Sequence, residues 1–378
     1  MNIIRTIKKG VPVSHTDTPY ETNLDLNNQE TILNYNISDI EKTNILKNNI
    51  DNEIEKKFFP KKLQTIELSK SYERLGYISK SIRVKECGTF LEFIAGENKH
   101  SLHNANFCRD RLCPLCSWRR SYKIFGQVSK IMNVIQNDYE FIFLTLTVPN
   151  VKDNELALKI DEMQKAWINL TKYNKRFKNA VVGYFKALEV THNKNKYSKS
   201  FDTYHPHYHL ILAVDKRYYK TKDYIKHSEW LEMWRKYMKD ESITQVDVRR
   251  CTNKDKSDCD KSEKALSSAV AEVAKYATKS SDYIIPWSDE LTDSSVNALL
   301  SALSNRRLCS FGGIFDKTRK LLKLEDIENG DLIHLDDTVR SDVALQIFRY
   351  SWSCGIYKLV AVEKKLNAFI ETSDHENI

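Results

Sequence analysis

Two histidines, His207 and His209, lie two residues apart in the segment HPHYHLILAV. Side chains alternate along a strand, so both imidazoles would project from one face while the aliphatic residues face the other. Two adjacent imidazoles make a bidentate site for a divalent metal, and we expect His207 and His209 to bind one. The alternative is a pair of surface histidines on an edge strand. His205 has the same parity but precedes Pro206, where the strand only begins, and is the weaker third candidate.

A carboxylate on a neighbouring strand could complete this site. Glu189 lies inside the segment VVGYFKALEVT (residues 181–191), where an acid between apolar residues is unfavourable without a partner. If that strand forms a hairpin with residues 207–214, Glu189 shares the face of the two histidines. Mg²⁺ and Mn²⁺ favour carboxylate ligands, so the sequence predicts one of these metals at Glu189, His207 and His209. The alternative for Glu189 is a solvent-facing side chain.

The segment 263–279 predicts a helix with an apolar stripe and a separate polar face. Glu272 and Tyr276 are four residues apart on the polar face, so their side chains are neighbours. Tyrosine becomes a useful nucleophile when cations stabilise its phenolate, which Lys275, Lys279 and a nearby metal could do. Glu272 is placed to activate a water or accept a proton. The alternative is an ordinary amphipathic helix with a solvated pair.

Cysteines with the spacing C-x4-C-x2-C occur in CRDRLCPLC, and they are Cys108, Cys113 and Cys116. Such a knuckle is typical of a structural zinc site, which requires a fourth ligand. Cys87 is favoured because CG at 87–88 resembles the tight turn of a second knuckle, and His100 and His103 are the alternatives. If no metal binds, these residues are buried free thiols. The remaining cysteines show no comparable spacing and are expected to be structural.

Basic residues crowd the cysteine knuckle, and this suits contact with phosphates. They are Arg109, Arg111, Arg119, Arg120 and Lys123. The net charge of +8 is distributed as −2 over residues 1–60, +14 over 61–285 and −4 over 286–378. A basic middle region indicates a polyanionic partner, most simply nucleic acid. The alternative is a lysine-rich, solvated surface.

Hydrophobic periodicity gives a clear element order in the middle of the chain. Strands are predicted at residues 141–148, 181–191, 207–214 and 243–250, and helices at 155–173, 228–239 and 263–279. The order β-α-β-β-α-β-α is typical of an α+β fold whose antiparallel sheet carries helices on one face. The other face would then be free for chemistry.

Four regions are expected along the 378 residues. Residues 1–60 are polar and largely disordered, and the alternative near Ser38–Asn49 is a short helix, because Ser38 and Glu41 have capping-box spacing. Residues 61–135 form a zinc-knuckle module that contacts DNA, 136–285 form the catalytic domain, and 286–378 have no assigned role. No apolar run is long enough to span a membrane, and the first residues lack the apolar stretch of a secretory signal. We therefore expect a cytoplasmic protein whose cysteines are reduced thiols or metal ligands.

Five sequence blocks together resemble a known family. CRDRLCPLCSWRR, FLTLTVPN, LEVT, HPHYHLILAV and EVAKYATK occur here in the order found in plasmid rolling-circle replication initiators (Rep proteins) of the HUH endonuclease superfamily. The resemblance covers roughly residues 80–285. It implies an HUH-type sheet in residues 136–285, a bacterial cytoplasmic location, and site- and strand-specific nicking of plasmid DNA at the double-strand origin.

The resemblance also assigns roles to residues. The family's nucleophile matches Tyr276, its paired metal ligands match His207 and His209, and the water-activating glutamate of the most similar branch matches Glu272. These roles imply a 5′-phosphotyrosine, a free 3′-OH, and hydrolysis at termination. FLTLTVPN is expected to position other groups, and Tyr283 is a poor second nucleophile. The implied partners are double- and single-stranded origin DNA, a host helicase and polymerase, and a second copy of the chain.

Two other classes of protein share some of these features. A conjugative relaxase or a single-strand transposase also combines paired histidines, a metal and a tyrosine. A zinc-containing DNA-binding regulator would have the cysteine knuckle and no catalysis. The upstream knuckle and the spacing of Glu272 and Tyr276 favour the replication initiator.

Overall fold

The computed structural model describes residues 37–96, 99–251, 269–274, 278–335 and 346–364. The chain divides into two compact units, Met1–Ile45 and Leu46–Ile378. In the first unit, the described residues 37–45 belong to helix α1 (Ile37–Glu53). The elements that carry the candidate sites all belong to the second unit. Among the described residues, no helix is both long and apolar enough to cross a bilayer.

A five-stranded antiparallel sheet has the strand order β6-β3-β5-β4-β7. Its strands are β3 (Tyr139–Thr147), β4 (Val181–Asn193), β5 (Thr203–Asp215), β6 (Val246–Arg250) and β7 (Cys309–Gly313). The predicted α+β class is confirmed, and the four predicted strands correspond to β3, β4, β5 and β6. Strand β7 was not predicted, because its sequence CSFGG is short and rich in glycine.

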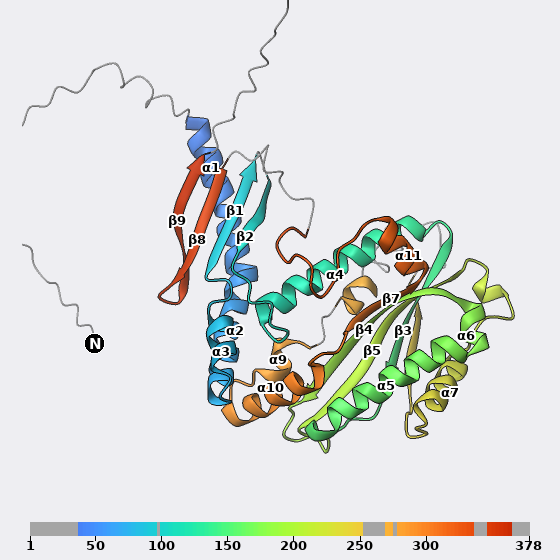
Figure 1. The fold of residues 1–378 in the computed structure, drawn as a ribbon. Coiled ribbons are helices and arrows are strands. Elements are labelled where there is room, and N and C mark those ends of the chain that lie inside the picture. Colours follow the sequence, from blue (N-terminus) through green and yellow to red (C-terminus); the bar gives the residue numbers. More distant parts are fainter. Residues whose placement is uncertain (1–36, 97–98, 252–268, 275–277, 336–345, 365–378) are drawn as a thin grey trace, which may run out of the picture. The chain divides into compact units, whose positions relative to one another are not determined.

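Helices α5 (Asp153–Tyr173) and α7 (His227–Met238) cover one face of this sheet (Figure 1). The indole of Trp167 on α5 meets the ring of Tyr184 on β4 edge-on, with centroids 4.9 Å apart. Tyr208 on β5 likewise faces Trp234 on α7. Between these elements lie the short helices α6 (Lys175–Ala180) and η3 (Tyr218–Lys220). Large aromatic side chains therefore hold both helices against the same face.

The opposite face is not free along its whole length, which corrects the prediction of helices on one face only. Phe315 on α11 (Ile314–Leu321) lies against Phe141 of β3, with ring centroids 6.2 Å apart. Helix α4 (Pro114–Ile135) packs against α11 in turn. The strands carry apolar residues on this face too, such as Phe185, and burying them requires a second layer. Only the end that carries the histidines remains for chemistry.

A second sheet joins residues from both ends of the unit, in the order β2-β1-β8-β9. Its strands are β1 (Phe90–Gly96), β2 (Lys99–Ala105), β8 (Gln346–Ser353) and β9 (Ile356–Lys364). Residues 346–364 therefore belong with the segment around the cysteines, whereas the sequence led us to expect a separate region from residue 286. Phe93 of β1 and Phe348 of β8 are adjacent and fully buried.

Helices precede this sheet. Helix α1 agrees with the short helix considered near Ser38–Asn49, whereas the residues from 50 to 60 were expected to be disordered. After α1 come η2 (Ile54–Phe58), α2 (Phe59–Arg74) and α3 (Ile78–Lys85). Leu46, Ile50, Ile54 and Phe58 recur every four residues and are all buried. The polar composition of residues 1–60 obscured this apolar stripe, which is the reason that residues 50–60 differ from the expectation.

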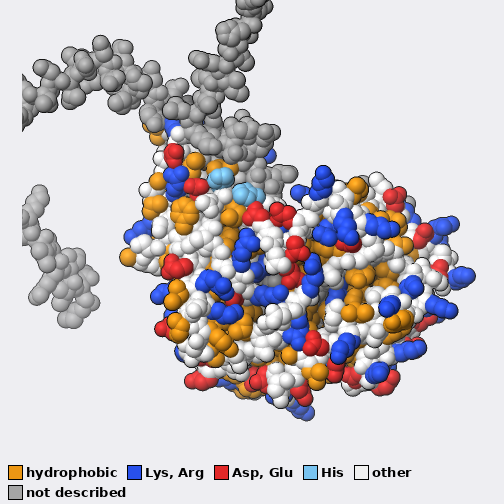
Figure 2. Space-filling model, in the orientation of Figure 1, with side chains coloured by type: hydrophobic (Ala, Val, Ile, Leu, Met, Phe, Trp, Pro, Cys, Tyr) orange, Lys and Arg blue, Asp and Glu red, His pale blue; other side chains and the backbone are white. Residues whose placement is uncertain are grey.

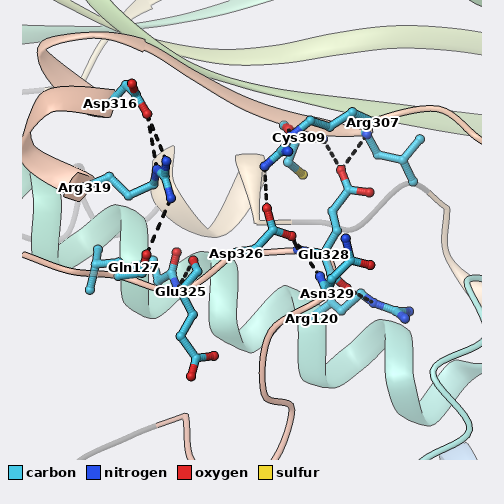
Figure 3. A network of polar contacts seen from close by, with 12 residues as sticks. Arg120, Gln127, Arg307, Cys309, Asp316, Arg319, Glu325, Asp326, Glu328 and Asn329 are labelled. Atoms are coloured by element: carbon cyan, nitrogen blue, oxygen red, sulfur yellow. Dashed lines mark hydrogen bonds and ion pairs between the residues drawn. The ribbon is translucent and has the colours of Figure 1, made fainter.

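A polar network fixes the segment after α9 (Ser280–Tyr283) and α10 (Asp289–Leu303), as Figure 3 shows. The buried carboxylate of Glu328 accepts the backbone N–H groups of Leu308 at 2.7 Å and Cys309 at 3.0 Å. Arg307 donates to Asp326 at 2.6 Å. Since Cys309 begins β7, this network sets the position of β7 beside β4.

We predict that Phe348→Ala lowers the free energy of unfolding by about 3–5 kcal/mol, because it leaves a cavity in a core that also contains the cysteines. Val360→Ala on β9 is the matched control, since Val360 is 59% exposed, and it should change stability little. Urea unfolding measures both. Equal effects of the two substitutions would mean that residues 346–364 do not complete the core.

Candidate active site and metal centres

The pairing of β4 with β5 brings three ligand-type side chains together. Glu189 lies opposite His207 in this ladder, and His209 follows two residues later on the same face. Glu189 Oε2 is 2.8 Å from His209 Nε2 and 3.4 Å from His207 Nε2. The two Nε2 atoms are 3.1 Å apart. All three side chains are buried, and the group could hold a metal ion.

The contact at Nδ1 of each imidazole ring leaves Nε2 facing the centre of the group formed by Glu189, His207 and His209. His207 Nδ1 lies 3.0 Å from the carbonyl oxygen of His205, which can only accept, so Nδ1 carries the proton. His209 Nδ1 lies 3.3 Å from the hydroxyl of Thr145 on β3, which can accept as well. With a cation bound, both Nε2 atoms would direct lone pairs to one point beside the Glu189 carboxylate. This donor set fits a bound cation.

The surroundings of Glu189 keep its carboxylate ionised, which is the form that can bind a cation. Burial would raise the pKa of Glu189, but the hydrogen bonds and charges of His207 and His209 outweigh burial and lower it. Lys279 adds a cation, with Nζ 3.7 Å from Glu189 Oε1. Burial, with the nearby His207, lowers the pKa of His205 to about 4. His205 stacks beside His207 and is not part of the converging group.

Glu272 lies beside the triad of Glu189, His207 and His209. Its Oε1 atom is 3.9 Å from His209 Nε2. Its side chain is 35% exposed, so water can reach it. Residues 269–273 are helical, as predicted for this segment. Lys275 and Tyr276 lie outside the described residues, and their predicted places on the polar face remain predictions.

The predicted helix does not extend to residue 279, which corrects the sequence expectation. Lys279 has extended backbone angles and precedes α9. Tyr283 is fully buried, and its hydroxyl donates to the carbonyl of Leu112. Burial raises the pKa of Tyr283 well above its usual value. A continuous helix would have placed Tyr283 on the polar face, so its burial decides the local conformation, and Tyr283 is unsuited to attack a phosphate.

The structure brings Cys87 together with the three cysteines of the knuckle. Sγ of Cys87 lies 3.6 Å from that of Cys116 and 3.5 Å from that of Cys113, and the Cys108–Cys116 distance is 3.7 Å. Four sulfurs at about 2.3 Å from a tetrahedral zinc would be about 3.8 Å apart, so the cluster fits that ion.

Two backbone amides support the cysteine cluster, and the alternative histidines lie elsewhere. The N–H groups of Cys108 and Arg109 donate to Sγ of Cys87 and Cys116, at 3.3 and 3.2 Å. Such N–H···S bonds favour the charged thiolate that binds metal. His100 pairs with Glu53, and the ring of His103 lies against that of His334.

Lys62 is a supporting residue that sequence reasoning missed. It is fully buried, and its Nζ donates to the carbonyls of Lys85 at 2.6 Å and Cys87 at 2.8 Å. Burial lowers the pKa of Lys62, while nearby Cys87 and Cys113 act in the opposite direction. One lysine among 59 basic residues gives no signal in the sequence. The sequence did point to Thr145, because this residue lies in the FLTLTVPN block, which was expected to position other groups.

The basic residues predicted to contact DNA are largely used inside the protein, which is a second correction. Arg119 is buried and donates to the carbonyls of Leu332 and Ile333, both at 2.7 Å. Buried Arg120 donates to the carbonyls of Arg109 and Asp110. These guanidinium groups satisfy backbone oxygens that would otherwise be buried without donors, and they are not accessible to phosphates.

Of the other three cations, Lys123 and Arg111 also donate inside the protein, whereas Arg109 is exposed. Lys123 is buried and donates to Glu325 and to the carbonyl of Asp331. Arg111 donates to the carbonyls of Leu303 and Arg306. Arg109 is exposed and donates to the carbonyl of Asn329, and of the five it is the most accessible to DNA.

Comparison with known proteins decides the family. Residues 99–357 match the family described as "Replication protein". The chain belongs to this family of Rep proteins. It is 38% identical over 296 residues to "Protein rep" of Bacillus amyloliquefaciens, covering 74% of this chain and 84% of that protein. The family membership predicted from the five sequence blocks is confirmed.

Two further Rep relatives extend the comparison. "Protein rep" of Lentilactobacillus hilgardii is 35% identical over 314 residues, covering 79% of this chain and 95% of that protein. "Protein rep" of Streptococcus pneumoniae serotype 2 is 34% identical over 284 residues, covering 73% and 83%. No solved structure matches the chain. The similarity thus includes the region of both cysteine and histidine clusters.

We predict that Thr145→Val weakens Mn²⁺ binding by roughly 10- to 100-fold, because it removes the hydrogen-bond partner that orients His209. Thr147→Val is the matched control on the same strand and face, since its hydroxyl donates to the carbonyl of Gln245. Isothermal titration calorimetry measures both affinities. Unchanged affinity in Thr145→Val would exclude a role in orienting the metal ligand.

We predict one zinc per chain, lost in Cys113→Ser with a large fall in thermal stability, because a structural zinc contributes folding free energy. Cys354→Ser is the control, since Cys354 is an exposed thiol outside the cluster. Elemental analysis and thermal melts test the prediction. Wild-type protein purified without chelators and free of zinc would contradict it.

Proposed function

We propose that this Rep protein initiates rolling-circle replication of a plasmid by nicking one DNA strand at the origin. The observation that supports this most strongly is the convergence of Glu189, His207 and His209 on one point, with Glu272 at its edge. A metal site beside an accessible carboxylate, in a replication protein, suits phosphodiester chemistry.

The first step is a transesterification by Tyr276. A divalent cation such as Mg²⁺ or Mn²⁺, held by Glu189, His207 and His209, would draw charge from a non-bridging phosphate oxygen. The phenolate oxygen of Tyr276 attacks phosphorus, the bond from phosphorus to the 3′ oxygen breaks, and that oxygen takes a proton. The products are a 5′-phosphotyrosine and a free 3′-OH. Lys279, close to Glu189, and Lys275 would stabilise the phenolate.

The second step uses water in place of tyrosine. Glu272 accepts a proton from a water molecule, whose oxygen attacks phosphorus at the regenerated origin site while the 3′ oxygen leaves. This cleavage forms a 5′-phosphate and no new covalent adduct. The carboxylate of Glu272 is suited to this role, because it is partly exposed to solvent and lies next to His209, one of the three residues that would hold the cation.

The remaining parts of the proposal concern fold, partners and location. The sheet is proposed to be of HUH type, and the cysteine cluster to hold structural zinc. Origin DNA, double- and single-stranded, is the proposed partner, with host helicase and polymerase and a second copy of the chain, in the bacterial cytoplasm. Figure 2 shows Lys and Arg side chains spread over the visible face between acidic ones. DNA contact is therefore expected from exposed cations such as Arg109 rather than from the buried ones.

We predict that Tyr276→Phe abolishes the covalent protein–DNA adduct and leaves DNA binding within about twofold, because only the attacking oxygen is removed. A labelled oligonucleotide spanning the plasmid's nick site, resolved on a denaturing gel, measures the adduct. Tyr197→Phe is a control, since Tyr197 is 98% exposed on a loop. An undiminished adduct in Tyr276→Phe would require another nucleophile, and no adduct in the wild type would leave a DNA-binding regulator.

We predict that Glu272→Ala keeps initial nicking within a few-fold and fails at termination, accumulating single-stranded DNA longer than one plasmid unit. Removal of the carboxylate eliminates the base for water, while Tyr276 and the triad remain. Southern analysis of replication products measures the ratio of multimeric to unit-length strands. Glu162→Ala on α5 is the control, since Glu162 lies on a helix that covers the other face. Normal unit-length product from Glu272→Ala would make Glu272 a surface residue without a catalytic role.

A further inference from the structure

A cavity of roughly 320 Å³ lies between α2, the start of α4 and residues 278–280. Of the residues that line it, only Lys279 was given a role by the sequence motifs. The side chains that matter for its chemistry are Lys61, Gln64, Trp118, Thr278 and Lys279. They combine one large aromatic ring, two cations and two uncharged hydrogen-bonding groups.

Trp118 provides a rigid aromatic surface in this cavity. Its indole packs edge-on against buried Phe58, with centroids 5.1 Å apart and an interplanar angle of 89°. Lys61 Nζ lies 4.7 Å from the centroid of the Trp118 ring. An aromatic ring with a neighbouring cation is suited to a base and its phosphate, since every nucleobase has a π face and every linkage carries a negative charge.

Thr278 and Gln64 line the cavity and have hydrogen-bonding groups without a partner among the described residues. Thr278 is 5% exposed, and its hydroxyl has no hydrogen-bond partner among the described residues. A buried hydroxyl without a partner is unfavourable, and a ligand that supplies one removes the cost. Gln64 accepts the Ser280 hydroxyl through Oε1 at 2.8 Å, which leaves its amide N–H groups for the edge of a ligand.

Lys279 connects the cavity to the metal triad. It lines the cavity, and its Nζ lies 3.7 Å from Glu189 Oε1. Glu189 is one of the three converging ligands, so a nucleotide in the cavity would neighbour a phosphate at the triad. The cavity is therefore placed to hold the nucleotide next to the one that is cut.

A second cavity shares Trp118 with the first. It has a volume of roughly 310 Å³. Lys57 and Tyr122 line the second one, each four residues from its counterpart, Lys61 or Trp118, in the first. Residues at this spacing share a helix face, so an aromatic row on α4 lies opposite a cationic row on η2 and α2. This arrangement matches the alternation of bases and phosphates along a single strand.

We propose that the first cavity binds a nucleobase of single-stranded DNA beside the cleaved phosphate, stacked on Trp118 and hydrogen-bonded by Thr278 and Gln64. The inference rests on the proposed function, because the strand that enters is the one that is nicked. It adds a base-binding subsite that is formed partly by α2 and by the first turns of α4, the helix that contains Cys116.

The test measures binding and contact with fluorescein-labelled dT12, a strand of twelve thymidines, without added Mg²⁺ or Mn²⁺. Trp118→Ala should weaken binding about tenfold, because one stacked base is lost. Trp118→Phe should retain most of the affinity, and Thr278→Val should weaken binding about twofold. Tyr173→Ala is the control, since Tyr173 lies on α5 away from the cavity and, like Trp118, has a lysine over its ring. Zinc content and thermal melts verify that each variant is folded.

A photo-crosslink supplies a readout that folding defects cannot mimic. With 5-iododeoxyuridine replacing thymidine in dT12, irradiation of wild-type protein should attach the strand to the peptide that contains Trp118. Unchanged affinity of folded Trp118→Ala, or crosslinks confined to other peptides, would overturn the subsite. The Tyr276 adduct on origin DNA is assayed in parallel. An adduct with no effect at Trp118 defeats the subsite alone, whereas a Trp118 crosslink with no adduct defeats nicking alone.

Discussion

The register of β4 against β5 is the constraint on which the candidate active site depends. Glu189 faces His207 across this ladder, and the two-residue period then places His209 on the same face. A slip of one residue would turn either Glu189 or the two histidines to the face packed under α5, so the hydrophobic packing on that face keeps the three side chains together. β3 adds Thr145 opposite His209, which orients the ring. The candidate metal site is thus a consequence of how three central strands pair.

The cysteine cluster and the triad are linked through the segment that follows Tyr276. Tyr283 donates to the carbonyl of Leu112, which immediately precedes Cys113, and Ser280 donates to Gln64 on α2. A metal ion that holds the four clustered cysteines together would therefore also fix the position of residues 278–283. Lys279, within this stretch, reaches Glu189. If the protein nicks DNA as proposed, a structural metal at the cysteines would set the position of Lys279, which is proposed to stabilise the attacking phenolate.

Short-range patterns predicted much of this arrangement. Alternation along residues 181–191 and 207–214 indicated both strands and the shared face of His207 and His209. Glu189 was expected on that face if the two strands paired as a hairpin, and they do. Long-range contacts were not predictable. Nothing local in Arg119 shows that it meets the carbonyls of Leu332 and Ile333, more than two hundred residues later, so a buried structural guanidinium looked like a phosphate ligand. The predicted continuation of the helix to Lys279 was wrong for the same reason. Tyr283 is buried by residues distant in the sequence, and this burial outweighs the local helical periodicity.

The central claim is that Glu189, His207 and His209 bind one divalent cation. Pulsed EPR of Mn²⁺ added to the zinc-loaded wild-type protein tests it directly, because imidazole nitrogens bonded to Mn²⁺ modulate its spin echo. The account predicts two such nitrogens in the wild type and one in His207→Ala. A wild-type spectrum in which Mn²⁺ has only water and carboxylate ligands would contradict it.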